Sequence, residues 1–380
     1  MKRSSFLQLF ITTALISITF SSCSLFENKP QNNNEVKVGT VLGLSGEGAV
    51  YGQKMKRGFE FAIDTANTSS PTPQKNQKIK LIIEDSQFDP AKAVSAYQKL
   101  TGVQGIKILV GVTGSKNALQ VCSVAKADNV VIIDALSTAP KISEDCGDNY
   151  FRVIASDALA GKYNVDWAIE SGMKKPAIVY IEDDWGTSYL KSTLDYLKEK
   201  GFTNFPTHGV KEGDRDFRTQ IQKLKAESPD TIFLLVYAKS AAGFMQQFRQ
   251  VGLKATIYGS DNLSSPEFVA AGKDVVEGVR VALPAPTEGQ KFNQFSQAYK
   301  AKFGEEPDAI IIKSYDAMKI ALDGIEKFGN DPVKIKEYLS YDTFQYQGVS
   351  GDIKFDKNGD LVSQKYTRLI YKNGAVVTFK

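Results

Sequence analysis

The fold of this chain is constrained most strongly by a regular alternation of short β-branched segments with amphipathic helical segments, which begins at Val36 and fills most of the 380 residues. Residues 36–42 alternate like a strand, and residues 51–67 then place Met55 and Phe59 at helical spacing. Repeated strand–helix units with apolar central runs are typical of a parallel sheet that helices cover on both faces. We therefore expect an α/β protein with doubly wound parallel sheets.

The pattern restarts after about residue 154, which predicts two similar α/β lobes. In the first half we expect strands at 36–42, 78–85, 106–112 and 130–135, and helices at 51–67, 90–100 and 115–127. In the second half we expect helices at 157–171, 185–200, 217–226 and 240–251, and strands at 176–182, near His208, and at 231–236, 256–259 and 278–282. The segment LPAP (283–286) interrupts the pattern, two helices follow at 290–303 and 309–328, and a hairpin of strands 351–355 and 364–371 comes last.

The first 22 residues predict an export signal. Lys2 and Arg3 form a short positive region, and the apolar run Phe6–Phe20 is too short for a comfortable membrane span. Two small residues directly precede Cys23, which resembles the lipobox of bacterial lipoprotein signals, where the cysteine becomes the acylated first residue. An ordinary cleaved signal with Cys23 unmodified is the alternative. Residues 1–22 are thus expected to be a lipoprotein signal peptide, and the polar segment 23–35 a flexible tether.

Composition excludes several classes of function. The 47 Lys and Arg residues are interleaved with 43 Asp and Glu residues, so the chain lacks the concentrated positive field that nucleic-acid binding needs. His208 is the only histidine, which argues against histidine-dependent catalysis and against a metal site. After export, Cys122 and Cys146 are the remaining cysteine pair, and they form either a disulfide or two separate thiols.

Glycines and hydroxyl residues gather where the predicted strands end. Gly46, Gly48 and Gly52 miss the G-x-G-x-x-G spacing of a dinucleotide site, and the turn GVTGS (111–115) lacks the Gly-Lys-Ser/Thr ending of a phosphate loop. We interpret the glycines as allowing a loop to approach a small ligand at the carboxyl edge of the sheet. Ser115, at a helix start, offers a hydroxyl and backbone N–H groups to a carboxylate, or acts only as a helix cap.

No loop carries a catalytic or metal-binding motif. Residues 136–140 (LSTAP) add another hydroxyl after the fourth strand, and Ser45 has neither a G-x-S-x-G context nor a nearby histidine. Residues 356–360 (DKNGD) lack the residue order and the distal Glu of a calcium loop, so a hairpin turn is expected there. The sequence therefore predicts a protein that is not an enzyme and that uses no metal and no cofactor.

Six segments, in their order and spacing, resemble the class I periplasmic solute-binding proteins of ABC importers, especially the branch that binds leucine, isoleucine and valine. The resemblance runs from about Val36 to the C-terminus. The segments are VKVGTVLGLSG (36–46) with Tyr51-Gly52, DSQFDPAKAVSAYQKL (85–100), the stretch 111–140, GDRDFRTQIQKLK (213–225), FRQVGLKATIYGSD (248–261) and GVSGDIKFDKNGD (348–360).

This resemblance implies a class I periplasmic-binding fold whose two lobes are built from discontinuous chain and joined by a three-segment hinge. The first lobe would contain residues 36–155 and 286–345, and the second lobe residues 156–285 and 346–380. The three crossings would lie near residues 154–157, 283–286 and 341–347.

The resemblance also implies a site for a free amino acid, bound as a zwitterion in the cleft between the lobes. Ser115 would hold the ligand carboxylate, Thr138 would contact both carboxylate and ammonium, and the backbone carbonyl of Leu136 would accept from the ammonium. Asp261, where the leucine-binding branch has Glu, would pair with the ammonium from the second lobe. Three aromatic residues would line the rest of the cleft, or else pack within the lobes: Tyr51, Trp185 and Tyr237. Four charged residues either approach the same cleft or lie on helix surfaces: Glu47, Lys116, Asp183 and Asp184.

The expected function is that of a monomeric lipoprotein, periplasmic or on the cell surface, tethered to the membrane through Cys23. It would capture an amino acid, branched-chain or related, as its lobes close, and deliver it to the transmembrane subunits of an ABC permease. Two alternatives keep the fold: a binder of urea, amides or aromatic acids, and a sensory ligand-binding subunit. A hydrolase or oxidoreductase is opposed by the missing nucleophile–base pair and the failed nucleotide fingerprint.

Overall fold

The computed structural model describes residues 35–69, 78–285 and 288–379. The predicted signal peptide, the lipidation at Cys23 and the tether up to Asn34 lie outside these residues. Among the described residues, no helix combines the length and the apolar character needed to cross a membrane. The segment from Glu35 to the C-terminal lysine is one compact unit.

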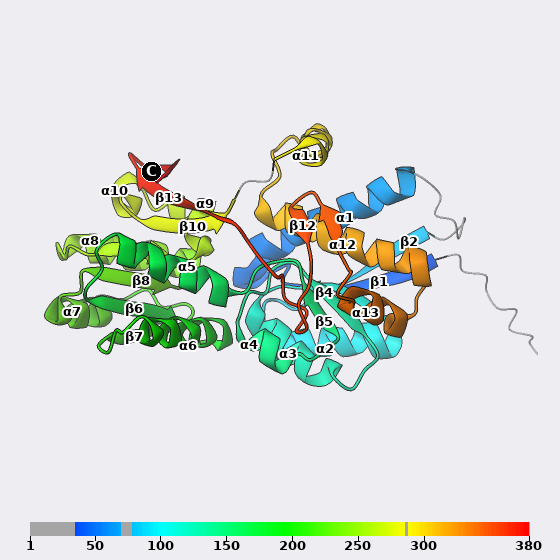
Figure 1. The fold of residues 1–380 in the computed structure, drawn as a ribbon, viewed down its shortest axis with the longest axis horizontal. Coiled ribbons are helices and arrows are strands. Elements are labelled where there is room, and N and C mark those ends of the chain that lie inside the picture. Colours follow the sequence, from blue (N-terminus) through cyan, green and yellow to red (C-terminus); the bar gives the residue numbers. More distant parts are fainter. Residues whose placement is uncertain (1–34, 70–77, 286–287, 380) are drawn as a thin grey trace, which may run out of the picture. The chain divides into compact units, whose positions relative to one another are not determined.

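The first lobe is built on a five-stranded sheet in which all neighbouring strands are parallel (Figure 1). The strand order is β2 (Lys78–Asp85), β1 (Glu35–Leu42), β3 (Ile108–Val112), β4 (Val131–Asp134) and β5 (Tyr150–Arg152). The order 2-1-3-4-5 is one of the common doubly wound arrangements, and it places a switch point between β1 and β3. The predicted α/β class is confirmed.

Successive side chains of the central strands point to opposite faces of this sheet. On β3, Ile108 and Val110 pack with one buried cluster, whereas Leu109 and Val112 pack with another. The strands are therefore buried on both sides, which is why they read as unbroken apolar runs in the sequence. The helices associated with this sheet are α1 (Ala49–Ser69), α2 (Pro90–Gln98) with the π-helix η2 (Lys99–Val103), α3 (Ser115–Ala125), α4 (Lys141–Asp145), α11 (Gln290–Phe303), α12 (Ala309–Phe328) and α13 (Pro332–Ser340).

The second lobe repeats the arrangement and extends it (Figure 1). Its sheet has the order β14 (Ala375–Thr378), β13 (Tyr366–Lys372), β10 (Arg280–Pro284), β9 (Thr256–Gly259), β8 (Thr231–Leu235), β6 (Pro176–Ile181) and β7 (Thr207–Val210). Strands β6 to β10 are parallel in the same order as the first sheet, and β13 and β14 add antiparallel pairs at one edge. The helices here are α5 (Asp157–Glu170), α6 (Asp184–Glu199), α7 (Arg218–Glu227), α8 (Ala238–Gln250), α9 (Pro266–Val269) and α10 (Lys273–Val276), with the 3-10 turn η3 (Asp261–Ser264).

Several helices begin where an aspartate accepts hydrogen bonds from the first turn. Asp89 caps α2 ahead of Pro90, Asp183 caps α6, and Asp308 caps α12. Such caps satisfy backbone N–H groups that have no partner inside the helix. They explain why the starts of these helices were visible in the sequence.

The C-terminal hairpin is the main correction to the predicted elements. Strand β12 (Gly351–Ile353) pairs with β11 (Tyr346–Gly348), and β13 pairs with β10 and β14, so the expected pairing of 351–355 with 364–371 is wrong. The turn between them is present, because the Asp356 N–H donates to the Asp360 carbonyl and Phe355 bridges Leu361. The elements α4, α9, α10, α13, β5, β11 and β14 were not predicted, and all of them except α13 have at most 5 residues, which is too short to show a period.

The last crossing between the sheets lies later than the expected 341–347. Phe355 packs against Phe151 and stacks on Phe344 in the core of the first lobe, and Leu361 belongs to the same cluster. The fully buried Arg152 donates to Asp360 at 2.6 Å, which ties the turn to the first lobe. We therefore infer that the first lobe extends to about Leu361, rather than ending at residue 345, and that the chain returns to the second sheet before β13.

A disulfide joins Cys122 of α3 to Cys146, directly after α4, with Cα atoms 4.8 Å apart. Both cysteines are buried. Of the two arrangements compatible with the sequence, the structure contains the bridge rather than two separate thiols.

Candidate functional site

A small pocket lies where strands of both sheets end. In doubly wound folds, ligands bind outside the carboxyl ends of the strands, near the point where the strand order reverses. The lining residues follow the carboxyl ends of β1, β2, β3 and β4 in one sheet and of β6, β8 and β9 in the other. They enclose about 50 Å³, and they are Tyr51, Phe88, Gly114, Ser115, Leu136, Thr138, Trp185, Tyr237, Asp261 and Asn262.

The structure therefore brings together all seven residues predicted to contact the ligand. Phe88, Gly114 and Asn262 also line the pocket and were not predicted from the sequence, and neither was Asp157, which is hydrogen-bonded to the lining. Gly114 and Asn262 directly precede or follow the predicted residues Ser115 and Asp261, so their place in the lining could have been inferred from those neighbours. Nothing in the sequence marked Phe88 or Asp157.

The first lobe contributes hydroxyl groups held in place by the backbone. The Ser115 hydroxyl accepts a hydrogen bond from the Ala139 N–H at 3.1 Å, so it bridges the loops after β3 and β4. Gly114 is the N-cap residue of α3 and has a φ of +89°, which glycine adopts readily. Ser115 is thus the first residue of the helix and not its cap, and it lies at the positive end of the helix dipole.

Two aspartates give the pocket an acidic side. Asp157 is 3% exposed, and its carboxylate accepts hydrogen bonds from Thr138 Oγ1 and Trp185 Nε1, both at 2.6 Å. Its pKa is raised to about 8, because burial disfavours the charged form and the nearby charge of Asp261 adds to the effect, although Thr138, Trp185 and Arg152 oppose it.

Asp261 is the second member of this acidic pair. Asp261 is exposed and lines the pocket, yet the surrounding protein raises the pKa of its carboxyl by desolvation, against hydrogen bonds from the backbone N–H groups of Asn262 and Asp261 itself. Within the part of the chain that the structure describes, neither carboxylate forms a salt bridge with a lysine or arginine. The charge of Arg152 acts on Asp157, but Arg152 forms its ion pair with Asp360. Asp157 and Asp261, here called the acidic pair, thus combine negative charge with desolvation.

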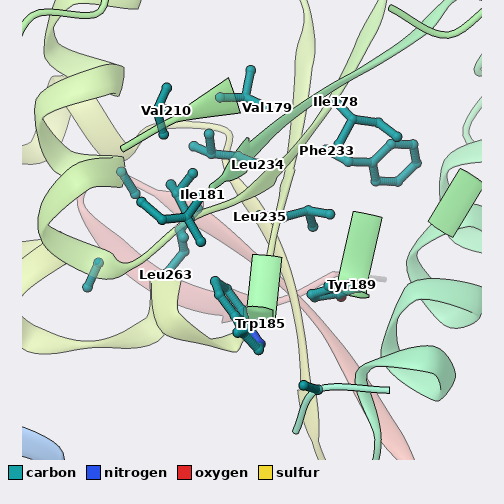
Figure 2. Packing of buried hydrophobic residues seen from close by; sticks show 14 of the residues in the cluster. Ile178, Val179, Ile181, Trp185, Tyr189, Val210, Phe233, Leu234, Leu235 and Leu263 are labelled. Atoms are coloured by element: carbon teal, nitrogen blue, oxygen red, sulfur yellow. The ribbon is translucent and has the colours of Figure 1, made fainter. Parts of the chain in front are cut away.

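Aromatic rings from the second lobe form one wall. Trp185 and Tyr237 stack with ring centroids 5.0 Å apart, and the Tyr237 hydroxyl donates to Asp183 at 2.6 Å. Trp185 also donates a longer bond to Thr138 Oγ1, at 3.2 Å. Figure 2 shows Trp185 and Tyr189 beside the buried side chains of β6 and β8, so one part of each ring completes the core of the lobe. Lining the pocket and packing in the core are therefore not alternatives for Trp185.

Polar contacts connect the two lobes around the pocket. The Tyr51 hydroxyl of α1 donates to Asn262 Oδ1 at 3.3 Å. Lys116 of α3 bonds Glu212, which follows β7, at 2.5 Å, and only 11% of the Lys116 side chain is exposed. Of the other charged candidates, Glu47 pairs with Lys239 across the same rim, and Asp184 faces Lys141.

The glycines singled out in the sequence have a different role from the one expected. A Cβ atom on Gly48 would lie 2.3 Å from the Phe88 ring, and one on Gly114 would lie 2.5 Å from it. Gly43 also faces Phe88, at 3.4 Å. Gly43 and Gly48 therefore make room for a protein side chain that borders the pocket and do not line the pocket themselves, which corrects the interpretation for these two; Gly114 makes room for the same ring and also lines the pocket.

A larger groove of about 1000 Å³ lies elsewhere, lined by α4, α5, α6 and residues 356–362. Its rim mixes lysines with acidic residues, and neither member of the acidic pair lines it. The described residues contain no cluster of three or more His, Cys, Asp or Glu side chains arranged to hold a metal ion. His208 lies in β7 and forms a hydrogen bond with Glu227 at 2.8 Å. It is not among the residues that line the small pocket.

The sequence profile of the periplasmic binding proteins matches residues 35–374. The chain belongs to the periplasmic binding protein family. Its members bind solutes, which agrees with a pocket that holds polar and charged groups without a nucleophile–base pair.

Relatives within the family agree with this assignment over nearly the whole chain. The leucine-, isoleucine-, valine-, threonine- and alanine-binding protein of Pseudomonas aeruginosa is 26% identical over 335 residues, which cover 87% of this chain and 88% of that protein. A crystal structure of a leucine-binding protein from Thermotoga maritima has a TM-score of 0.81 at 24% identity and covers 91% of this chain and 98% of its own. A solute-binding protein of R. palustris in complex with benzoate has a TM-score of 0.78 at 21% identity, with 90% and 95% covered. The predicted two-lobed fold is confirmed by these neighbours.

Proposed function

We propose that this chain binds a free α-amino acid between its lobes and delivers it to an ABC permease. The observation that carries the proposal is the acidic pair, two desolvated carboxylates on one side of the pocket with no cationic side chain paired to them among the described residues. Carboxylates in such surroundings are stabilised by a cation that enters with its own charge. The ammonium group of an amino acid is a cation of suitable size and donates three hydrogen bonds.

The opposite requirement, a place for the ligand carboxylate, is met in the first lobe. Ser115 begins α3, so its hydroxyl and the positive helix end both favour an anion. Thr138 lies between Ser115 and the acidic pair, bonded to Asp157, and so borders both ends of a bound zwitterion. The Leu136 carbonyl adds an acceptor on the ammonium side. Tyr51, Trp185 and Tyr237 then surround the ligand side chain.

Relatives that bind amino acids support the same class of ligand. The Pseudomonas protein is named for leucine, isoleucine, valine, threonine and alanine. Delivery to the transmembrane subunits of a permease, export to the periplasm or cell surface, tethering through Cys23 and a monomeric state complete the proposal, and they rest on the family and on the N-terminal sequence.

An aromatic acid is the second candidate, because aromatic rings dominate the pocket and one structural neighbour holds benzoate. An aromatic acid carries no ammonium, so it gains nothing from Asp261. The two candidates therefore differ in their response to neutralisation of that residue.

The test is calorimetric titration of the twenty amino acids, and of benzoate, against the wild type and Asp261→Ala. Removing one partner of a buried charge pair costs about 2 kcal/mol or more, so affinity for the amino acid should fall by roughly thirtyfold or more. Asp216→Ala is the matched control, because Asp216 is an exposed acid of the second lobe whose ion-pair partner among the described residues is Arg218. Unchanged amino-acid affinity in Asp261→Ala, or wild-type binding of benzoate alone, would reject the proposal.

A further inference from the structure

Phe88 borders the pocket in an unusual backbone conformation. Gln87 and Phe88 have φ values of +52° and +59°, in the left-handed region that residues other than glycine rarely adopt. Phe88 is only 6% exposed although it lies in the connection between β2 and α2. Such strain persists only where the surrounding structure fixes it, and it concentrates at ligand sites. The backbone therefore directs this ring to one place.

Three glycines leave the space that the ring occupies. Gly43, Gly48 and Gly114 come from the connections after β1 and β3, and a Cβ atom on Gly48 or Gly114 would collide with Phe88. The ring cannot swing away from the pocket into these connections without meeting their backbone. Its position is thus determined from the side of the first lobe.

The second lobe and α3 hold the same ring from other directions. Phe88 meets Tyr237 edge to face, with centroids 6.1 Å apart, and Lys116 Nζ lies 4.2 Å from the ring centroid. Lys116 is itself fixed by Glu212. Phe88 therefore closes the pocket at the boundary between the lobes.

The other walls are equally constrained. Trp185 is held by Asp157 and Thr138, Tyr237 by Asp183, and Tyr51 by Asn262. The pocket volume of about 50 Å³ is far below the ~300–1,000 Å³ of typical small-molecule sites. Because each aromatic wall is fixed by a hydrogen bond or by close packing, rotation of a single side chain does not provide room for a branched aliphatic group.

The geometry points to Phe88 as a specificity-determining residue that restricts the ligand to α-amino acids with short side chains, such as glycine, alanine and serine. This inference rests on the proposed function and narrows its ligand class. The acidic pair and Ser115 hold the groups common to all amino acids, whereas Phe88 limits what the α-carbon carries.

The test compares glycine, alanine, serine and leucine by calorimetric titration with the wild type, Phe88→Ala and Gly48→Ala. The wild type should bind a short amino acid more tightly than leucine, and Phe88→Ala should raise leucine affinity by about tenfold or more, the scale on which a hydrophobic pocket discriminates by size. In Gly48→Ala the new methyl group displaces the Phe88 ring, so alanine affinity should fall by about tenfold. The double variant Gly48→Ala/Phe88→Ala should recover alanine binding, because the ring that collides is gone.

Gly102→Ala is the matched control, since its Cβ atom would meet nothing within 4 Å. Thermal unfolding checks that each variant is folded, and if Gly48→Ala is not, the Phe88→Ala titration alone decides. Equal wild-type affinities for alanine and leucine, or a folded Phe88→Ala whose leucine affinity is unchanged, would overturn the role of Phe88 and leave amino-acid binding intact. Failure of the wild type to bind any amino acid would instead remove the proposed function on which this inference rests.

Discussion

Asp157→Asn tests whether ligand binding displaces a proton from the acidic pair. The change removes one charge and keeps the shape of the side chain, so the Asn oxygen still accepts from Trp185, which donates to Asp157 Oδ2 at 2.6 Å in the wild type. Burial and the charge of Asp261 raise the pKa of Asp157, so the ligand-free pair keeps a proton near neutral pH. An ammonium ligand is attracted more strongly once that proton leaves, because the pair then carries two negative charges instead of one.

The magnitude follows from linkage. Release of one proton on binding makes affinity rise about tenfold per pH unit below the pKa of the ligand-free pair, since one pKa unit is worth about 1.4 kcal/mol. Wild-type affinity should therefore increase by about thirtyfold from pH 5.5 to pH 7, a range in which the ammonium group of a free amino acid stays protonated. In Asp157→Asn the slope should be much shallower, because only Asp261 remains and it no longer faces a second carboxylate.

The free energy of unfolding gives an independent readout of the same groups. A carboxyl whose folded pKa is raised stabilises the fold fully below its unfolded pKa of about 4, and this stabilisation is lost as pH rises toward the folded pKa. The ligand-free wild type should thus lose stability from this group between pH 4 and pH 8, and Asp157→Asn should lose less.

The assay is calorimetric titration at pH 5.5, 6.25 and 7 in two buffers of different ionisation enthalpy, which counts protons released per ligand. Urea unfolding at the same pH values supplies the stability slope. A wild-type affinity that is independent of pH, with no proton released, would refute the account of the acidic pair.

Two further predictions concern other parts of the structure. Cys122→Ser should lower the free energy of unfolding by about 3 kcal/mol, because the bridge closes a loop of 24 residues. Urea unfolding with and without reductant measures this loss. Equal stability of the wild type in both conditions would contradict the bridge. Lys116→Ala removes the ion pair with Glu212 between the lobes and should weaken ligand affinity by about threefold, chiefly through a faster off-rate. Lys191→Ala, at an exposed lysine, is the control. A slower off-rate in Lys116→Ala would contradict a role of this ion pair in holding the lobes closed.

The fold was predictable because its signals are local. The central strands of both sheets are buried on both faces, so they appear as apolar runs such as ILVGV in β3, and aspartates such as Asp89 and Asp308 mark helix starts. The pairing of the C-terminal strands was not predictable, because β13 pairs with β10, which lies far away in the sequence. Strand β12 pairs with β11, which has 3 residues and is too short to show a period.

The residues of the candidate site also fall into those that the sequence predicted and those that it did not. Ser115, Thr138 and Asp261 lie in segments that resemble the family, and each directly follows a predicted strand, so their convergence could be expected. Asp157 and Phe88 could not be identified, since one lies at a helix start in a crossing segment and the other in a connection between a strand and a helix. Their importance depends on neighbours more than fifteen residues away, including Thr138 and Tyr237.

By itself, the sequence determined the alternation of strands and helices, the two-lobed α/β class, the family and the residues expected to contact an amino acid. These follow from periodicity and from motifs whose residues are neighbours along the chain. Only the tertiary structure decided that Asp157 and Asp261 lie close enough for the charge of one to raise the pKa of the other, and that Gly43 and Gly48 make room for Phe88 instead of lining the pocket. Charge interaction and steric exclusion act through space, so residues distant in sequence acquire these roles only when the fold brings them together.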